Sequence, residues 1–249
     1  MTDIYRPPES DLTVQGYVDG TGGSIESTLA GRFEFSPPDT IGVAFGHLKG
    51  VKRYVLLATL VYMAAAFALG FLQGVLTVYS GLPDTIGGAV ALWLFEILTQ
   101  SFILMPLFAG GVWIVLRHLS GRPLSAGLMF SQLPKAGRIG VMYVMITMLL
   151  IVGFLLLILP GIYLAIAYSL ALPLMIDRDM SPWQAMETSR KLVSKCWWRS
   201  LAFVLLIGLI LLASAVFLLI PLIWTLPAMA VAYGLYYRSL AGIRNAALD

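Results

Sequence analysis

Apolar residues stand in long uninterrupted stretches of this chain rather than alternating with polar ones. Stretches of about 20 apolar residues are typical of helices that cross a bilayer, because a helix rises about 1.5 Å per residue and the hydrocarbon layer is about 30 Å thick. The pattern therefore predicts an all-α membrane protein with six transmembrane helices. The predicted spans are residues 54–78, 86–116, 139–159, 162–176, 200–220 and 222–237.

Short turns join these spans in pairs. Pro83 follows the first span, Pro160 the third and Pro221 the fifth. Proline and the glycines beside it commonly end a helix and form a tight turn. The sequence thus predicts three helical hairpins. Pro106 lies inside the long second stretch, where we expect a kink or a steep tilt.

Basic residues gather at one side of the predicted hairpins. If the chain ends and the two long loops, residues 117–138 and 177–199, lie on one side of the membrane, all 16 Lys and Arg lie there and the three tight turns carry none. Cytoplasmic loops of membrane proteins are enriched in Lys and Arg. We therefore expect both termini to be cytoplasmic.

The composition excludes an ordinary soluble domain. Charged residues make up only 12% of the 249 residues and the mean hydropathy is +0.87, whereas a soluble domain has about 25% charged residues. The net charge of +3 comes from basic residues at the ends of apolar stretches. There they set the orientation and contact lipid headgroups, so we expect no nucleic-acid partner. The single cysteine, Cys196, allows no intrachain disulfide.

A basic amphipathic segment precedes each predicted hairpin. The clearest one begins at Ser181, where an N-cap serine, Pro182 at the first helical position and Gln184 at the third predict a capping box. We interpret the chain as three copies of one unit, a cytoplasmic interfacial helix followed by a hairpin. The alternative is that hydropathy alone makes any hairpins look alike.

Residues 1–39 differ in kind from the rest of the chain. Tyr5 to Pro8 favour an extended polyproline conformation, and a glycine-rich stretch follows at residues 20–23. The first 12 residues have no apolar core, so we expect no cleavable signal peptide. We expect a mostly flexible cytoplasmic arm over residues 1–39 and a membrane domain over residues 40–249.

Several short motifs carry a resemblance to a known family. They are Leu159-Pro160-Gly161-Ile162-Tyr163-Leu164, Ala171-Leu172-Pro173-Leu174, Ser181-Pro182-Trp183-Gln184-Ala185-Met186, Ser189-Arg190-Lys191-Leu192 and Trp197-Trp198. With these motifs the chain resembles the YciC-like family of bacterial inner-membrane proteins over about residues 40–240, and it is similar to the membrane domain of glycerophosphodiester phosphodiesterases. The resemblance implies a multi-pass protein of the bacterial inner membrane. It implies no activity, because the soluble domain that holds the catalytic metals of those enzymes has no counterpart in this sequence.

Glu96 is the one acidic residue inside a predicted span. An ionisable side chain at membrane depth costs several kcal/mol unless it faces a cavity, pairs or stays protonated. Gln100 lies one helical turn away and is a candidate hydrogen-bond partner. One interpretation is a proton or cation site in a transport path, and the other is a protonated carboxyl satisfied by neighbouring helices. Similarly, Pro106, Pro173 and Pro227 either mark broken helices around a substrate site or simply shape the packing.

Aromatic and basic residues around the last amphipathic segment are candidates for contact with lipid headgroups or with a partner protein. They are Trp183, Arg190, Lys191, Lys195, Trp197, Trp198 and Arg199. The alternative is ordinary anchoring at the membrane interface. The sequence has no His-Glu-x-x-His, Cys-x-x-Cys or Gly-x-Ser-x-Gly motif, so we expect no catalytic residue, metal or cofactor.

These features favour a non-enzymatic membrane protein that acts as an accessory, scaffold or lipid-associated factor. Its expected partners are membrane lipids, including anionic ones, and another membrane protein. The alternative function is a small transporter or channel that uses Glu96 as an intramembrane proton or cation site.

Overall fold

The computed structural model describes residues 22–80, 85–217 and 219–244, and these residues form helices and no strand. The all-helical class is therefore confirmed for the part of the chain that is described. In chain order the helices are α1 (Ile25–Leu29), α2 (Pro37–Gly46), α3 (Lys52–Ser80), α4 (Ile86–Thr99), the π-helical segment η3 (Gln100–Leu104), α5 (Met105–Leu119), the 3-10 segments η4 (Ala126–Phe130) and η5 (Leu133–Lys135), α6 (Ala136–Leu156), α7 (Ile158–Ala167), α8 (Ala171–Arg178), α9 (Pro182–Lys195), α10 (Trp197–Val216) and α11 (Leu222–Ala241).

Five helical stretches of the described residues are long and apolar enough to cross a membrane. They are Lys52–Ser80, Ile86–Leu119, Ala126–Leu156, Ile158–Arg178 and Trp197–Val216. A multi-pass membrane protein is thus the class that these helices fit. The sixth predicted span, residues 222–237, does form a helix, α11, but it does not belong to this set. Three tyrosines, Pro227 and Arg238 make it less apolar than the others.

The long second stretch contains the expected irregularity, in the form of a π-helical segment. Over η3 the Met105 N–H donates to the carbonyl of Gln100, five residues back. Pro106 follows directly and has no N–H to donate to the carbonyl four residues before it. One extra residue in the turn accommodates this gap, as in the π-bulges found inside other helices.

The predicted boundaries around Pro160 need correction. The chain reverses at Leu157, which has an extended backbone (φ −166°, ψ 155°), and not at Pro160 and Gly161. Pro160 lies in the first turn of α7, where the missing N–H costs no helical hydrogen bond. The fourth predicted span, residues 162–176, is also not one helix, because residues 168–170 separate α7 from α8.

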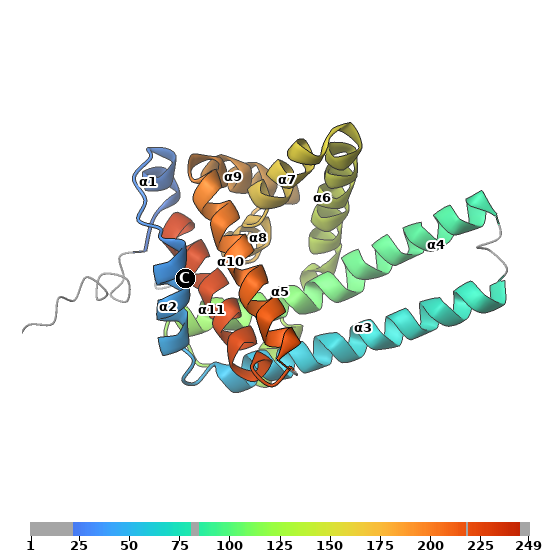
Figure 1. Cartoon of the computed structure of the whole chain (residues 1–249), viewed down its shortest axis with the longest axis horizontal. Helices are drawn as coiled ribbons and strands as arrows, with labels where there is room; N and C mark the ends of the chain where they lie inside the picture. The colour runs from blue at the N-terminus through green and yellow to red at the C-terminus, as the bar shows by residue number, and fades with distance from the viewer. Residues whose placement is uncertain (1–21, 81–84, 218, 245–249) are drawn as a thin grey trace, which may run out of the picture.

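The helix pairs α3/α4, α6/α7 and α10/α11 lie as three hairpins whose ends point in different directions (Figure 1). The sequence argument instead places all three ends together on the membrane side opposite the basic loops. The Lys52 ammonium lies 4.3 Å from the centre of the Trp224 ring, so the beginning of α3 contacts the beginning of α11. This contact does not fit three parallel hairpins that each cross completely, since Lys52 and Trp224 would then lie at opposite surfaces.

The core of the protein is built around α11. Twelve residues of this helix are buried, and α2, α5 and α10 pack against it. Tyr236 and Tyr237 are fully buried, and their hydroxyls donate to Ser200 Oγ (2.8 Å) and to Asp177 Oδ2 (2.7 Å). The most polar of the predicted spans is therefore largely enclosed by protein.

The expected flexible arm contains a docked part. Of residues 1–39, the first 21 lie outside the described residues, whereas residues 22–39 contact the C-terminal end of α11 and the beginning of α10. The Thr28 hydroxyl donates to the Leu240 carbonyl (2.7 Å). Phe35 is 2% exposed, and its ring centroid lies 4.8 Å from that of Tyr236 and 5.5 Å from that of Phe203.

Two of the three expected amphipathic segments form helices, α2 and α9, and the middle one forms the short segments η4 and η5. In α9 the predicted capping box is present, with Ser181 and Gln184 exchanging hydrogen bonds. Met186 and Val193 of its apolar side are buried against the protein, while Trp183 is exposed. The apolar side of α9 thus packs on the helical bundle.

Candidate functional site

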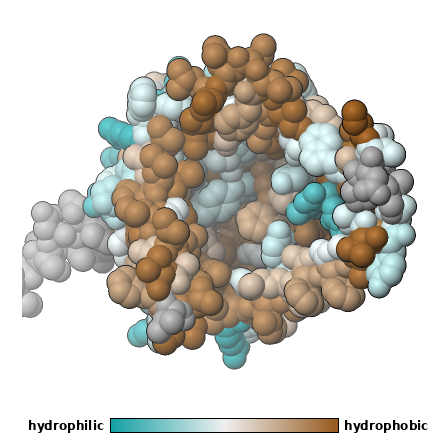
Figure 2. Space-filling model, turned by 45° about the vertical axis from the view of Figure 1, so that its right-hand side comes forward, coloured by the Kyte–Doolittle hydropathy of each residue, from teal (hydrophilic) through white to brown (hydrophobic). Residues whose placement is uncertain are grey.

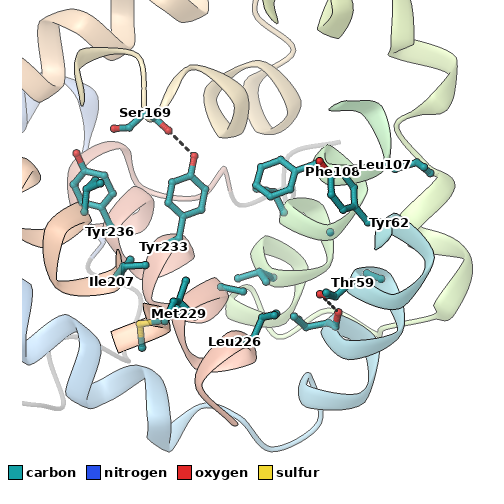
Figure 3. A pocket seen from close by; sticks show the side chains of 18 of the residues that line it. Thr59, Tyr62, Leu107, Phe108, Ser169, Ile207, Leu226, Met229, Tyr233 and Tyr236 are labelled. Atoms are coloured by element: carbon teal, nitrogen blue, oxygen red, sulfur yellow. Dashed lines mark hydrogen bonds between the residues drawn. The ribbon is translucent and has the colours of Figure 1, made fainter. Parts of the chain in front are cut away.

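A cavity of about 450 Å³ lies between helices that belong to the first and third hairpins. Its walls come from α3, α5, α10 and α11, together with residue 169 in the break between α7 and α8. Figure 3 labels ten of the lining residues, and Figure 2 shows the molecule hollowed between rims of apolar side chains. The lining residues are Val55, Ala58, Thr59, Tyr62, Leu107, Phe108, Gly111, Val112, Val115, Ser169, Phe203, Val204, Ile207, Leu211, Leu226, Met229, Ala230, Tyr233 and Tyr236.

Two tyrosine hydroxyls of the lining are held by the protein itself. The Tyr233 hydroxyl donates to the Ser169 carbonyl, and the Tyr236 hydroxyl donates to Ser200 Oγ (2.8 Å). Figure 3 shows Tyr233, Tyr236 and Ser169 close together at one end of the cavity. These bonds fix the orientation of both rings, so this end of the cavity is rigid and carries its few polar atoms.

Tyr62 is placed differently. It comes from α3, its ring packs against the edge of Phe108 at 6.3 Å between centroids, and its hydroxyl has no hydrogen-bond partner among the described residues. The hydroxyl of Thr59, one helical turn earlier, already donates to the Val55 carbonyl (2.9 Å). Tyr62 therefore offers the cavity a hydroxyl that the protein leaves available.

The irregular parts of the helices border this cavity. Leu107 and Phe108 follow Pro106, Leu226 precedes Pro227, and residue 169 lies in the α7–α8 break shortly before Pro173. In membrane helices such interruptions are tolerated where neighbouring groups satisfy the freed backbone atoms. Pro227 does not break its helix, since α11 continues from Leu222 to Ala241, and Pro173 lies in the first turn of α8.

Ser189 of α9 holds the break between α7 and α8. Its hydroxyl donates to the Ala167 carbonyl (2.7 Å) and accepts from the Leu170 N–H (3.1 Å). The fully buried Ser189 side chain thus provides a hydrogen-bond partner for one backbone group at the end of α7 and for one at the beginning of α8. This gives a structural reason for the serine that begins the Ser189-Arg190-Lys191-Leu192 motif.

Behind the cavity wall, on the side of the docked arm, Phe35 packs against the lining residues Phe203 and Tyr236. Behind it, Cys196 Sγ lies 3.4 Å from Ser200 Oγ and is buried. Burial raises the pKa of the Cys196 thiol, so the thiol stays protonated and unreactive at neutral pH.

Glu96 and Gln100 do not line the cavity. Glu96 is exposed on α4, and Gln100 is partly exposed at the beginning of η3. The Thr99 hydroxyl between them donates to the backbone carbonyls of Phe95 and Glu96, not to a carboxylate. The structure therefore brings neither residue to the site described above.

The predicted headgroup residues divide into two groups. Arg190 and Lys191 pair with Glu187 at 2.8 and 3.4 Å. The hydrogen bond from Arg190 is the main reason that the pKa of Glu187 falls to about 2 and that the pKa of Arg190 rises. Arg199 donates to the Phe35 carbonyl (3.1 Å). These three cations are partly engaged by the protein itself.

The remaining candidates present their side chains outward, with one exception. Trp183 and Trp198 are 62% and 76% exposed, and Lys195 is exposed at the end of α9. Trp197 instead stacks on Tyr163 with 6.2 Å between ring centroids. The exposed part of the predicted surface thus consists of Trp183, Trp198 and Lys195, together with Lys191 and Arg199, which are exposed although they contact other groups of the protein.

Sequence reasoning missed a polar cluster that fixes the loop after α8. Lys135 and Arg138 both bind Asp179 Oδ1, at 3.1 and 3.0 Å, and this lowers the pKa of Asp179. Asp179 has a left-handed backbone (φ 53°). The partners are more than 40 residues apart, so no local pattern reveals the pairing. Within the described ranges, no three His, Cys, Asp or Glu side chains gather to form a metal site.

Comparison with protein-family models, with curated proteins and with solved structures gives no match for this chain. The function is therefore argued from the cavity and its surroundings.

Proposed function

We propose that this chain is a non-enzymatic, multi-pass membrane protein that holds the apolar part of a membrane lipid in the cavity between its first and third hairpins. The observation that carries this proposal is the cavity of about 450 Å³ with its almost entirely apolar lining. Small-molecule sites are typically apolar concavities of roughly 300–1,000 Å³ with a few placed polar groups. The protein would act as a lipid-associated accessory factor or scaffold.

Hydrophobicity alone would not retain a lipid in this cavity. A lipid tail is as well solvated by other tails as by Leu or Val side chains, so moving it into the protein gains little from the hydrophobic effect. Retention would rest on close packing against rigid rings and on hydrogen bonds at the tyrosine end. The hydrogen bonds of Tyr233 and Tyr236 and the tight Phe35 cluster provide that rigidity.

The distribution of charge supports cytoplasmic termini and a bacterial inner-membrane location for this function. All 16 Lys and Arg lie outside the three hairpin ends, as expected if the loops and chain ends that carry them face the cytoplasm. Trp183, Lys195 and Trp198 would then meet headgroups of the cytoplasmic leaflet. Membership of the YciC-like family is part of the same proposal. The capping box at Ser181 and the helix break held by Ser189 give its motif an architectural meaning.

The alternative, a transporter or channel that uses Glu96, stays a prediction. It requires a path for the ion past that carboxyl, and Glu96 lies on the exposed side of α4, apart from the cavity lining. No observation in the described residues favours it over lipid binding. A Glu96→Gln variant in vesicles would test it by measuring proton flux.

The proposed function is tested by the lipid that accompanies the purified protein. The protein is extracted directly from membranes into polymer-bounded discs, moved to mild detergent, and analysed for retained lipid by native mass spectrometry. A Cβ added at Gly111, in the cavity wall, would touch only Ala58 at 4.0 Å. Gly111→Leu should therefore fill the cavity and lower the retained lipid at least fivefold.

Gly208→Leu is the matched control, because Gly208 is an exposed glycine of α10 with nothing within 4 Å of an added Cβ. It should retain as much lipid as the unaltered protein. Absence of retained lipid from the unaltered protein, or equal retention in both variants, would contradict the proposal.

A further inference from the structure

The lining of the cavity contains no side chain with a full charge. None of the lining residues in the described part of the chain is Lys, Arg, His, Asp or Glu. An ionised group at membrane depth is costly unless an opposite charge or water compensates it. A phosphate or ammonium drawn into this cavity would find neither. The group that enters must therefore be uncharged.

The polar atoms of the cavity suit an uncharged oxygen. The Tyr62 hydroxyl has no protein partner among the described residues, so it can donate to a ligand oxygen or accept from a ligand hydroxyl. The Tyr233 hydroxyl lies across the cavity from it (Figure 3), donates to the Ser169 carbonyl and keeps a lone pair to accept with. A ligand hydroxyl or carbonyl could pair with Tyr62, whereas a purely hydrocarbon molecule would leave that hydroxyl unsatisfied.

We infer that the cavity selects an uncharged lipid that carries a hydroxyl or carbonyl oxygen on a hydrocarbon chain, and excludes the phosphorylated head of a phospholipid. This inference rests on the proposed function and specifies its ligand. The oxygen binds beside the Tyr62 hydroxyl, and the chain occupies the part lined by Val55, Ile207 and Leu226.

The test compares two lipids that differ only in a phosphate. A diacylglycerol and the corresponding phosphatidate, with the same diazirine-bearing chain, are added in equal amounts to nanodiscs that contain the unaltered protein. After illumination, the cross-linked positions are read by peptide mass spectrometry. Labelling of cavity residues is divided by labelling around Phe67 and Phe71, which are exposed on α3 and touch bulk lipid.

The diacylglycerol should label the cavity at least tenfold more than the phosphatidate, and Tyr62→Phe should lower that labelling about fivefold, as expected for one lost hydrogen bond. Equal cavity labelling by both lipids would overturn the uncharged class and leave lipid binding intact. Cavity labelling no greater than that of the exposed face of α3, with either lipid, would overturn the proposed function itself.

A second inference concerns the third hairpin and comes from a different contact. The Lys52 ammonium lies 4.3 Å from the Trp224 ring centre. Lys52 begins α3 at its basic end, so its charge belongs at the aqueous surface. Trp224 follows the turn of the third hairpin by only a few residues. If that hairpin crossed the bilayer, the two residues would be about 30 Å apart.

The end of the third hairpin also suits a hydrocarbon environment. Val216, Phe217, Leu219 and Ile220 are 60–72% exposed, and no charged residue stands near them. Three main-chain donors near the turn have partners: the N–H groups of residues 217, 222 and 224 donate to carbonyls three or four residues back, at 3.0–3.2 Å. Pro221 has no N–H. These bonds lower the number of main-chain donors that the turn leaves for water.

The geometry points to a third hairpin that stays in the leaflet next to the basic surface and presents the outer face of α10 to its hydrocarbon. The first test is a double-cysteine cross-link, Lys52→Cys with Trp224→Cys, in native membranes and with Cys196→Ser. A short bifunctional thiol reagent should join the two cysteines efficiently, since a contact between the ends of two long side chains does not by itself place the Cα atoms within disulfide distance. The control pair Lys52→Cys with Tyr79→Cys joins the two ends of α3 and should not react.

The second test measures depth with a spin label at Leu219→Cys. The label should be accessible to oxygen and protected from a water-soluble nickel complex, at a depth on the basic side of the bilayer centre. A label at the level of the opposite headgroups would overturn the inference, even if the cysteine pair happened to be badly oriented for cross-linking.

Discussion

The α3 helix and the α11 helix are both hydrophobic, yet they have different surroundings. Of the most apolar part of α3 only 11% of the residues are buried in the protein, and Phe67, Phe71 and Tyr79 are 77%, 68% and 85% exposed. In α11, Ala228, Val231, Leu235 and Tyr236 are each 0–1% exposed. The more apolar helix meets lipid, and the more polar helix forms the core. An apolar sequence thus shows that a helix avoids water. Buried hydroxyls that bond to other elements, as in α11, show that protein and not lipid covers the helix.

The largest expected effect is the difference in stability loss between alanine substitutions of two phenylalanines. Phe35 is 2% exposed in the aromatic cluster beside α11, and Phe67 is 77% exposed on α3. Phe35→Ala should lower the free energy of unfolding by about 3 kcal/mol, because a large buried ring leaves a cavity. Phe67→Ala should change it by less than about 1 kcal/mol, since lipid fills the space. Thermal unfolding in the same detergent measures both, and equal losses would contradict the core assigned here.

Two glycines test the same contrast when a methyl group is added to each by substitution with alanine. A Cβ at Gly110 of α5 would meet the Met129 carbonyl oxygen at 1.9 Å, so Gly110→Ala must displace backbone and should cost about 2 kcal/mol. Gly74 of α3 has nothing within 4 Å of an added Cβ, so Gly74→Ala should be neutral or slightly stabilising. Reversal of this order in detergent unfolding would show that η4 does not pack on α5.

The two sides of α9 provide a finer comparison. Ser189 makes two hydrogen bonds at the α7–α8 break, whereas Ser194 is exposed and bonds to Tyr163 and to its own helix. Ser189→Ala should lower stability by about 1–2 kcal/mol because it leaves buried backbone groups unsatisfied. Ser194→Ala should stay within about 0.5 kcal/mol. Ser189→Ala should also lower lipid retention, since Ser169 and Tyr233 depend on that break.

The smallest effect concerns pH on the exposed side of α9. Arg190 holds the pKa of Glu187 near 2, below its ordinary 4.5. A lowered folded pKa gives stability that is present above pH 4.5 and is lost as the pH falls toward 2. Unfolding temperatures of the unaltered protein and Glu187→Gln should differ slightly at pH 6 and converge toward pH 2, and added salt should reduce the difference. A difference that grows on acidification would contradict the pairing.

Local sequence patterns determined several elements correctly. The capping box at Ser181 predicts the beginning of α9, and Pro106 predicts a disturbance that appears as η3. These predictions succeed because the interactions involved join residues within one helical turn. The turn at Leu157 was misplaced at Pro160, because proline is equally compatible with a turn and with the first turn of a helix.

By itself the sequence determined that the chain is helical and apolar enough for a membrane, because those properties follow from transfer of each side chain out of water. Only the tertiary structure decided which helix is enclosed, how Tyr62, Ser169 and Tyr233 surround one cavity, and that Lys52 meets Trp224. Hydropathy has the same value whether a residue is covered by lipid or by protein. Contacts between residues more than 100 positions apart leave no trace in a local pattern.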